Sequence, residues 1–355
     1  MVQMRARDYG LRVGSLPTGP RNKITDVPGV LVGHCTVDTP DHKTGVTVVL
    51  PGPQNPFTHK LPAAVCQYNG FGKTTGLMQL SELGTLETPI ALTNTLNVGL
   101  VHDAIVEYML QRCQAEGVEL HSVNPVVGEC NDATLNRIAE RCVGREQVFA
   151  ALAAAAPDFD EGDVGAGKGT ICHGLKGGIG SASRVLEYDG QTYTMGLLVQ
   201  SNHGVLSDLT VCGRRIGPAL AQRLETRKAD QGSILAVLGT DLPLDARQLG
   251  RVAKRVSVGL ARMGSYVGHG SGEVFLAFST ANPFQVQAEN AVRLVSAFHE
   301  EKLDGPFRAA AECAEEAVLN SLLTARTVVG WQGRRAVALT DLWRPQPPAE
   351  KAFGD

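Results

Sequence analysis

Hydrophobic residues along the chain alternate between short β-rich runs and stretches with helical spacing. Residues 30–37 and 44–50, separated by the turn-rich segment TPDHK, predict a β-hairpin, and residues 183–202 predict a second one. In the second hairpin, Asp189-Gly190 is a strong two-residue turn signal. Further buried strands are predicted at residues 62–68, 90–94, 233–240 and 272–280.

Helical spacing is clear in residues 98–116, where Val101, Ile105, Tyr108 and Met109 share one face. Hairpins that alternate with helices favour an α/β protein in which helices cover mixed or antiparallel sheets, and they argue against a doubly wound parallel sheet. Further helices are predicted at residues 244–263, 285–299 and 306–324.

The segments between these elements are less regular. The start of the helix at 244–263 is indicated by Asp241 and Pro243. Residues 205–231 carry many charges in a loose apolar pattern, which predicts an exposed connection with some helix. The proline-rich residues 343–355 predict a flexible tail.

Composition sets the class of protein. A chain of 355 residues with 43% hydrophobic and 19% charged residues must bury a large core, and we expect a single domain over residues 1–355. With 33 basic and 36 acidic residues, the chain lacks the excess of basic residues expected of a protein that binds nucleic acid or an anionic membrane surface. No apolar leader region or run of about 18 apolar residues is present, so a cytoplasmic location is expected.

The eight cysteines are widely spaced and include no Cys-x-x-Cys pair. The spacing therefore suggests neither a disulfide framework nor a structural zinc site. We expect reduced and mostly buried thiols.

The segment GDVGAGKGT at residues 162–170 nearly matches a phosphate-binding loop. Gly169 stands where such a loop has the serine or threonine that holds magnesium, and alanine-rich helix rather than a strand precedes the segment. A glycine-rich turn whose backbone packs near a site is the better interpretation.

The nine histidines form no metal-binding spacing, and no His is placed near a second ligand in the sequence. His34, His173 and His203 lie in strand-like or turn contexts. They are interpreted as structural histidines with satisfied hydrogen bonds, and no metal or cofactor is predicted.

Gly232-Ser233 marks a sharp change of pattern, because a charged segment ends there and a hydrophobic strand begins with the serine. Cleavage before Ser233 would give this serine a free α-amine beside its own hydroxyl, which is a known way to activate a nucleophile. An α-amine has a pKa near 7.7 to 8.0, against ~10.4 for lysine, so it can act as a base near neutral pH. Glycine at position 232 would tolerate the backbone strain that such an attack needs.

Several long segments carry a specific resemblance. The chain resembles the L-aminopeptidase/D-esterase family, which includes the β-peptidyl aminopeptidases, in blocks that follow the family order. The blocks are ITDVPGVLVGH (24–34), LGTLETPIALTNTLNVG (83–99), VVGECNDATLN (126–136), GDVGAGKGT with KGGIGSASR (162–184), LLVQSNHG (197–204), and GSILAVLGTDLPL with GSGEVFLAFST (232–280).

This resemblance implies an α-β-β-α sandwich, similar in layout to N-terminal-nucleophile hydrolases but connected differently. It also implies a precursor that cleaves itself between Gly232 and Ser233 into chains 1–232 and 233–355. A homo-oligomer, a tetramer of processed heterodimers, is implied as well. The implied activity is removal of amino-terminal residues from short peptides, amides or esters.

The resemblance also assigns roles to individual residues. Ser233 matches the nucleophile, Ser271 and Glu273 match a serine and an acidic residue that relay its proton, and Asn202 matches an oxyanion-hole asparagine. Glu129 matches an acidic residue suited to holding the substrate amino group. Asn131 is a substrate-binding candidate at a position where some relatives carry tyrosine, and the neighbouring Cys130 has no assigned role.

Two alternatives remain open. The same nucleophile could serve an amidase or acyltransferase that acts on a non-peptide amide. Asn131, at a position where some relatives carry tyrosine, would also fit a family member that has lost its catalytic activity and keeps the fold as a binding protein.

Overall fold

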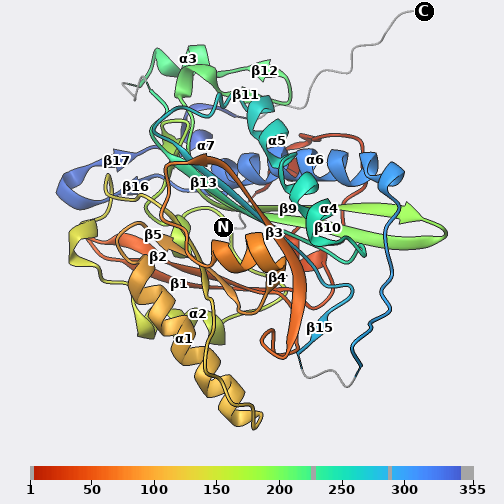
Figure 1. The fold of residues 1–355 in the computed structure, drawn as a ribbon. Coiled ribbons are helices and arrows are strands. Elements are labelled where there is room, and N and C mark those ends of the chain that lie inside the picture. The colour runs from red at the N-terminus through yellow and green to blue at the C-terminus, as the bar shows by residue number, and fades with distance from the viewer. Residues whose placement is uncertain (1–3, 225–228, 287–289, 345–355) are drawn as a thin grey trace, which may run out of the picture.

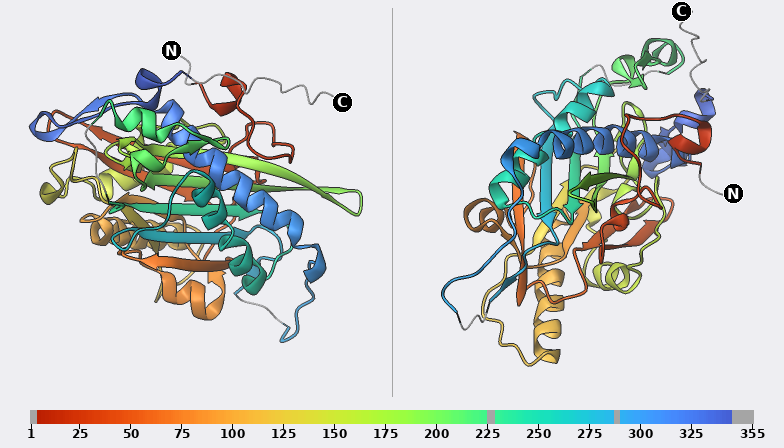
Figure 2. Two further views of the ribbon diagram at one scale, coloured as in Figure 1. Left: turned by 90° about the horizontal axis from the view of Figure 1, so that it is seen from above. Right: turned by 90° about the vertical axis from the view of Figure 1, so that its right-hand side faces the viewer.

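The structure, a computed structural model, describes residues 4–224, 229–286 and 290–344. Two β-sheets pack face to face, and helices cover the outer surface of each (Figure 1). Figure 2 shows the long helix α6 (Asp304–Thr324) lying across one sheet, with α1 (Val98–Ala115) on the other side of the molecule. The α-β-β-α sandwich expected for this chain is confirmed.

The smaller sheet has four strands in the order β1-β2-β5-β6. The predicted hairpin is present, with Leu31 opposite Leu50 and Asp38 opposite Lys43, while β5 and β6 are parallel. Helices α1 and α2 pack on its outer surface. The bounds are β1 Leu31–Asp38, β2 Lys43–Leu50, β5 Ile90–Asn94, β6 Val126–Cys130 and α2 Arg145–Ala153.

The larger sheet has the order β15-β3-β14-β13-β10-β9, and β4 pairs with β3. Strands β13 and β14 are parallel, whereas their outer neighbours β10 and β3 run antiparallel to them. Helices α4, α5 and α6 cover this sheet. The bounds are β3 His59–Gly70, β4 Thr85–Leu86, β9 Gly178–Tyr188, β10 Gln191–Asn202, β13 Ser233–Thr240, β14 Gly272–Ser279, β15 Phe284–Gln285, α4 Ala246–Ala253 and α5 Val256–Arg262.

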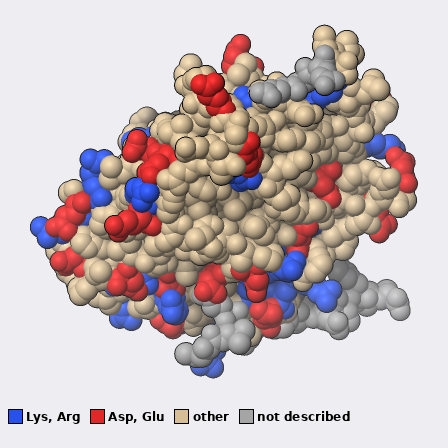
Figure 3. Space-filling view, turned by 90° about the horizontal axis from the view of Figure 1, so that it is seen from below, with Lys and Arg blue, Asp and Glu red and all other residues tan. Residues whose placement is uncertain are grey.

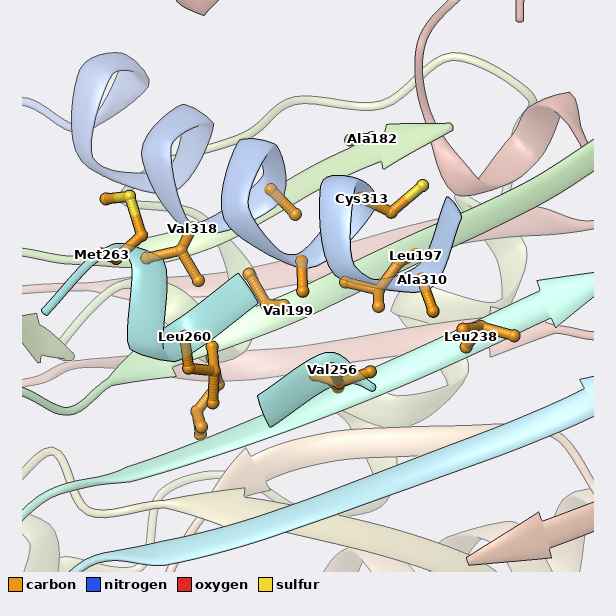
Figure 4. Packing of buried hydrophobic residues seen from close by; sticks show 14 of the residues in the cluster. Ala182, Leu197, Val199, Leu238, Val256, Leu260, Met263, Ala310, Cys313 and Val318 are labelled. Carbon is orange, nitrogen blue, oxygen red and sulfur yellow. The ribbon is translucent and has the colours of Figure 1, made fainter. Parts of the chain in front are cut away.

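Every residue of β13 is buried, because the strand lies between two hydrophobic layers. Ile234 and Leu238 pack toward the helices, whereas Leu235 and Val237 pack toward the smaller sheet. Figure 4 shows Leu238 together with residues of α5 and α6 in the helix-side cluster. A strand buried on both sides is held rigidly, so its first residue is placed accurately.

The remaining elements are short. Three two-stranded hairpins are formed by β7 Ile171–Cys172 with β8 Leu175–Lys176, β11 Thr210–Val211 with β12 Arg214–Arg215, and β16 Val328–Val329 with β17 Arg335–Ala336. The short helices are α3 Gly217–Ala221 and α7 Leu339–Leu342, with single turns η1 Ala6–Tyr9, η2 Ile24–Asp26, η3 Gln79–Leu83, η4 Ile138–Glu140, η5 Gly165–Gly167, η6 Leu206–Asp208, η7 Glu300–Lys302 and η8 Trp331–Gly333.

The prediction of a helix at 285–299 is wrong. Gln285 belongs to β15, and residues 290–299 contain no helix. Their apolar residues have helical spacing, yet Val292 and Leu294 are 82% and 97% exposed. Because these apolar side chains are not buried against another element, tertiary packing does not stabilise a helix in this segment.

Two other predictions are corrected in part. The helix at 244–263 is split into α4 and α5, and it starts after Asp245, whose carboxylate accepts a hydrogen bond from Gln248 N, rather than at Asp241 and Pro243. The connection 205–231 contains the predicted helix, but Leu206 and Leu220 are buried in the core. Residues 345–355 of the predicted tail lie outside the described residues.

Charges on the surface are mixed. On the face seen in Figure 3, acidic and basic side chains alternate around a broad area without charged residues. Among the described residues, no helix combines the length and the hydropathy needed to span a membrane.

Candidate active site

The ends of three neighbouring strands bring together most of the residues expected at the site. Ser233 is the first residue of β13, and it lies opposite Asn202 on β10 and Gly272 on β14. Ser271 and Glu273 flank Gly272 in the sequence. All four candidate side chains are buried, and Ser233 is 5% exposed. Residues up to 71 positions apart in the sequence thus meet at the ends of inner strands of the large sheet.

The peptide bond between Gly232 and Ser233 lies in a tight and specific setting. The Gly232 carbonyl oxygen accepts a hydrogen bond of 3.1 Å from Gly272 N. A Cβ atom at position 232 would come within 1.7 Å of the Asn202 carbonyl oxygen. Gly232 is not among the residues with positive φ, so close approach of the backbone, rather than backbone strain, requires glycine here.

Ser271 and Glu273 form a buried pair. The Ser271 hydroxyl donates a short hydrogen bond to Glu273 Oε1, while Glu273 Oε2 has no partner among the described residues. Burial raises the pKa of Glu273 to about 7, the hydrogen bond from Ser271 opposes that rise, and the negative charge of Asp230 adds to it. A carboxyl group with a pKa near neutrality can exchange a proton under ordinary conditions.

Two side chains that the sequence interpretation missed hold the loop before Ser271. Asn69 Nδ2 donates to the carbonyl oxygens of Gly268 and Ser271 at 2.9 and 2.6 Å. The buried Asp230 carboxylate accepts from Gly204 N at 2.9 Å and from Gly268 N at 3.5 Å. Asp230 therefore links the segment that precedes Ser233 to the loop that carries Ser271.

The same loop contains a strained residue. Val267 has φ 55°, a left-handed conformation that is rare for a β-branched side chain. Such strain tends to lie near functional sites, where the surrounding structure holds the backbone in place.

Asn202 is oriented by one hydrogen bond. Its Oδ1 accepts from Ile171 N at 2.8 Å, which fixes the direction of the side-chain amide. The Asn202 side chain bonds to the described residues through Oδ1 only, so its Nδ2 donor is available to a ligand.

Glu129 and Cys130 reach the site from the smaller sheet. Glu129 is 2% exposed, and its carboxylate accepts from Lys73 N at 3.1 Å and from the Thr95 hydroxyl. Cys130 Sγ lies 3.6 Å from the carbonyl oxygen of Ser233. The end of β6 therefore lies directly against the first residue of β13.

A short segment connects Glu129 to the strand ends. The Phe71-Gly72 backbone packs against Gly272, because a Cβ at position 272 would come within 2.4 Å of the Phe71 carbonyl oxygen. A Cβ at Gly72 would lie 3.9 Å from Glu129 Oε1. Glu129 is thus separated from Gly272 by a single layer of backbone.

Asn131 is placed differently from the other candidates. It is exposed, and its Oδ1 accepts from Ala133 N at 3.1 Å within a local turn. The structure joins it to none of the other candidate residues by a hydrogen bond, and its role in substrate binding stays a prediction.

The glycine-rich segment 162–170 packs as a structural turn. Gly165 N and Ala166 N donate to the hydroxyls of Thr36 and Thr47, and Lys168 pairs with Asp163 and Asp38. Groups that would cradle a phosphate are therefore already engaged.

The histidines differ from one another. His34 bonds through both ring nitrogens, to Thr47 Oγ1 at 2.9 Å and to Asp160 O at 3.1 Å, as predicted for a satisfied structural histidine. His173 and His203 are fully buried, and each leaves Nε2 without a partner among the described residues. The interpretation of these two as satisfied is therefore wrong.

Comparison with known proteins places this site in a family. The model of peptidase family S58 matches residues 22–336. "Beta-peptidyl aminopeptidase BapA" of Sphingosinicella microcystinivorans is 38% identical over 353 residues, covering 93% of this chain and 88% of that protein. Among solved structures, a β-aminopeptidase of Burkholderia sp. is 40% identical with a TM-score of 0.88, covering 96% of this chain and 100% of that one. The L-aminopeptidase D-Ala-esterase/amidase from Ochrobactrum anthropi is 38% identical with a TM-score of 0.86, covering 94% and 95%.

The Ochrobactrum structure is described as a prototype for the serine aminopeptidases and a variant of the N-terminal-nucleophile hydrolase fold. Fold and site therefore define the class of this protein as a hydrolase with that variant fold. The chain belongs to peptidase family S58. Its resemblance to the L-aminopeptidase/D-esterase family is confirmed, and so is the expectation of a peptidase of the kind represented by these relatives.

Proposed function

We propose that this protein is a self-processing aminopeptidase whose Ser233 becomes an N-terminal nucleophile after cleavage of the Gly232–Ser233 bond. The observation that carries the proposal is the position of Ser233. It begins a buried strand, its preceding carbonyl already accepts a hydrogen bond from Gly272 N, and the Ser271–Glu273 pair and Asn202 lie on the strands to either side.

Self-cleavage would proceed in two steps. Ser233 Oγ attacks the Gly232 carbonyl carbon, and the developing oxyanion keeps the hydrogen bond from Gly272 N. The C–N bond then breaks, the nitrogen takes up a proton as the new α-amine, and an ester joins the two segments. Water hydrolyses this ester to give chains 1–232 and 233–355.

Before cleavage, Ser233 has no α-amine, so another base must accept its hydroxyl proton. Glu273 suits this step because its pKa of about 7 leaves much of it ionised at neutral pH, and the Ser271 hydroxyl can relay the proton. After cleavage, the α-amine takes over as the base.

Turnover would use the same nucleophile on a substrate carbonyl. Ser233 Oγ attacks, Asn202 Nδ2 donates to the oxyanion, and the leaving amine or alcohol receives the proton from the α-ammonium group. Water then releases the acyl group and restores Ser233. Glu129 would hold the positively charged amino group of the substrate, which limits cleavage to the amino-terminal residue.

The names of the relatives support short peptides, amides and esters as substrates, since they include a β-peptidyl aminopeptidase and an esterase/amidase. A direct test combines intact-mass analysis with a panel of aminoacyl p-nitroanilides and their N-acetylated forms. We expect two chains, the smaller beginning at Ser233, and hydrolysis of the free-amine forms only. A single intact chain with full activity would contradict the proposal.

Glu129→Gln is expected to raise KM for free-amine substrates by about 10- to 100-fold, the loss that corresponds to one hydrogen bond with a charged partner. The amide keeps the shape of the side chain but removes its charge. Steady-state kinetics on free-amine substrates measures the effect, and the inhibition constants of analogues that lack the amino group give the reference. Glu87→Gln, at another buried glutamate that pairs with Lys60, should leave KM unchanged. An equal loss of affinity for substrates and analogues would assign Glu129 a structural role only.

Self-cleavage is expected to depend on pH through Glu273. Its pKa of about 7 means that it is protonated, and unable to accept a proton, at more acidic pH. The cleavage rate of freshly refolded precursor should therefore fall about tenfold per pH unit below 7 and level off above it. Glu273→Gln should cleave slowly at every pH tested. Gel analysis of chain release against time measures both, and a flat profile in the wild-type chain would contradict the role.

We also propose that the processed protein is a cytoplasmic homo-oligomer, the tetramer of heterodimers implied by the resemblance. Light scattering of purified protein gives its mass in solution, and fractionation of cells gives its compartment.

A further inference from the structure

Three potential metal ligands from two separate segments of the chain meet beside Asn202. Cys172, His173 and His203 each offer one ligand atom, and these atoms all lie within 4.8 Å of one another. All three residues are buried. The backbone joins the two segments directly, because His173 N donates to the His203 carbonyl oxygen at 2.6 Å.

Two buried nitrogen atoms in this cluster have no partner. Nε2 of His173 and Nε2 of His203 make no hydrogen bond with any described residue. His173 Nδ1 lies 3.1 Å from the Val205 carbonyl oxygen, a contact that places the ring proton on Nδ1 and leaves a lone pair on Nε2. A buried unpaired nitrogen costs about 1 to 3 kcal/mol, so two of them in one cluster indicate a missing ligand.

The surrounding backbone is shaped closely around these side chains. A Cβ at Gly204 would come within 2.5 Å of the His173 ring, and a Cβ at Gly177 within 2.8 Å of Cys172 Cβ. His173 itself adopts φ 49°, a conformation that costs energy for a residue other than glycine. Both glycines belong to the blocks shared with the family.

We infer that Cys172, His173 and His203 bind one thiophilic transition-metal ion, with Zn²⁺ as the best fit. A thiolate and two imidazoles suit zinc and disfavour the hard cations Mg²⁺ and Ca²⁺, which prefer oxygen ligands. Zinc holds sulfur at ~2.3 Å and nitrogen at ~2.0 Å, so its ligand atoms stand about 3.5 Å apart. Because the ligand atoms lie within 4.8 Å of one another, the closure needed is at most about 1.3 Å, within the reach of side-chain rotation.

The ion would act on the structure around Asn202. Ile171, whose N–H orients Asn202, directly precedes Cys172, and Asn202 directly precedes His203. An ion shared by Cys172 and His203 therefore fastens β7 to the end of β10 and holds the asparagine between them. This site goes beyond the proposed function, and it does not depend on the cleavage chemistry.

The test begins with elemental analysis of the purified full-length protein after dialysis against a weak chelator. We expect zinc in a one-to-one ratio with the chain. Protein unfolded in chelator and refolded with Co²⁺ should develop the intense charge-transfer absorption of a cobalt–thiolate bond. X-ray absorption at the metal edge should give one sulfur and two nitrogen neighbours from the protein.

Cys172→Ser is the key variant, since it changes one atom and should lose both the metal and the cobalt–thiolate band. Cys313→Ser is the matched control, because Cys313 on α6 is equally buried but bonds to the Met195 carbonyl oxygen and to neither histidine. It should keep the metal. Failure of the wild-type chain to take up metal during refolding with Zn²⁺ or Co²⁺ would overturn the inference, as would full metal content in Cys172→Ser.

Discussion

Replacing Ser233 by alanine is expected to leave one intact chain of 355 residues with no measurable aminopeptidase activity. In the proposed mechanism the substitution removes the one atom that attacks in both cleavage and turnover, and loss of a nucleophile typically costs about 10⁴- to 10⁶-fold in rate. The fold should persist, because the change removes a single hydroxyl from a strand buried on both sides. Intact mass, circular dichroism and p-nitroanilide assays measure the three effects.

Two further variants make this result specific. Ser233→Cys keeps a nucleophile at the same position and should still release the smaller chain through a thioester. Ser279→Ala removes another buried serine of the large sheet, one that donates to the Leu242 carbonyl oxygen, and it should be cleaved and active. Cleavage of Ser233→Ala at the wild-type rate would show that another group attacks the bond.

Local sequence patterns were sufficient to predict the elements that carry their own signals. The hairpin at 183–202 forms with Asp189 and Gly190 both at positive φ, the conformation that a two-residue hairpin turn needs. The helix predicted at 306–324 is present as α6. In such segments, the pattern and the tertiary environment favour the same structure.

The helix expected at 285–299 was wrong for a tertiary reason. Its periodic apolar residues Val292, Leu294 and Val295 are exposed, because no neighbouring element covers them in the described chain. Periodicity states only which face a helix would bury. It does not state whether a surface to bury that face exists.

The candidate site, like the fold, was predicted from the sequence only in part. The change of pattern at Gly232-Ser233 pointed to Ser233, and the resemblance added Ser271, Glu273 and Asn202. The structure brings these four to adjoining strand ends. Asp230 and Asn69 were missed, because their importance lies in contacts with a loop far away in the sequence. An acidic residue three positions before Ser233 was the available signal for Asp230.

Gly232 illustrates how a correct residue can have the wrong explanation. The sequence suggested glycine for the sake of a strained backbone, whereas the structure needs it because the Asn202 carbonyl oxygen lies where a Cβ would be. The distinction matters for function, because this contact places the backbone of Asn202, the proposed oxyanion donor, against the Gly232–Ser233 peptide bond.

Asn202→Asp is expected to separate self-cleavage from turnover. Aspartate keeps an oxygen to accept the Ile171 N–H but loses the Nδ2 donor, so kcat should fall by about 10²- to 10³-fold with KM nearly unchanged. Self-cleavage should continue, because the Gly232 carbonyl oxygen is bonded by Gly272 N and not by the Asn202 side chain. Intact mass reports cleavage, and steady-state kinetics of the cleaved protein reports turnover.

The control for Asn202→Asp should replace another side-chain amide of the same strand, one whose donor does not face the site. Gln200→Glu does this on the same strand, because Gln200 Nε2 donates to the carbonyl oxygens of Thr93 and Ala166 between the sheets. It should lower the free energy of unfolding, since it buries a charge without a donor, and it should leave kcat nearly unchanged. If Asn202→Asp stayed uncut, both reactions would depend on the same amide, and Gly272 N would not suffice for the first. If it were cut and fully active, the oxyanion donor would have to be another group at the ends of these strands.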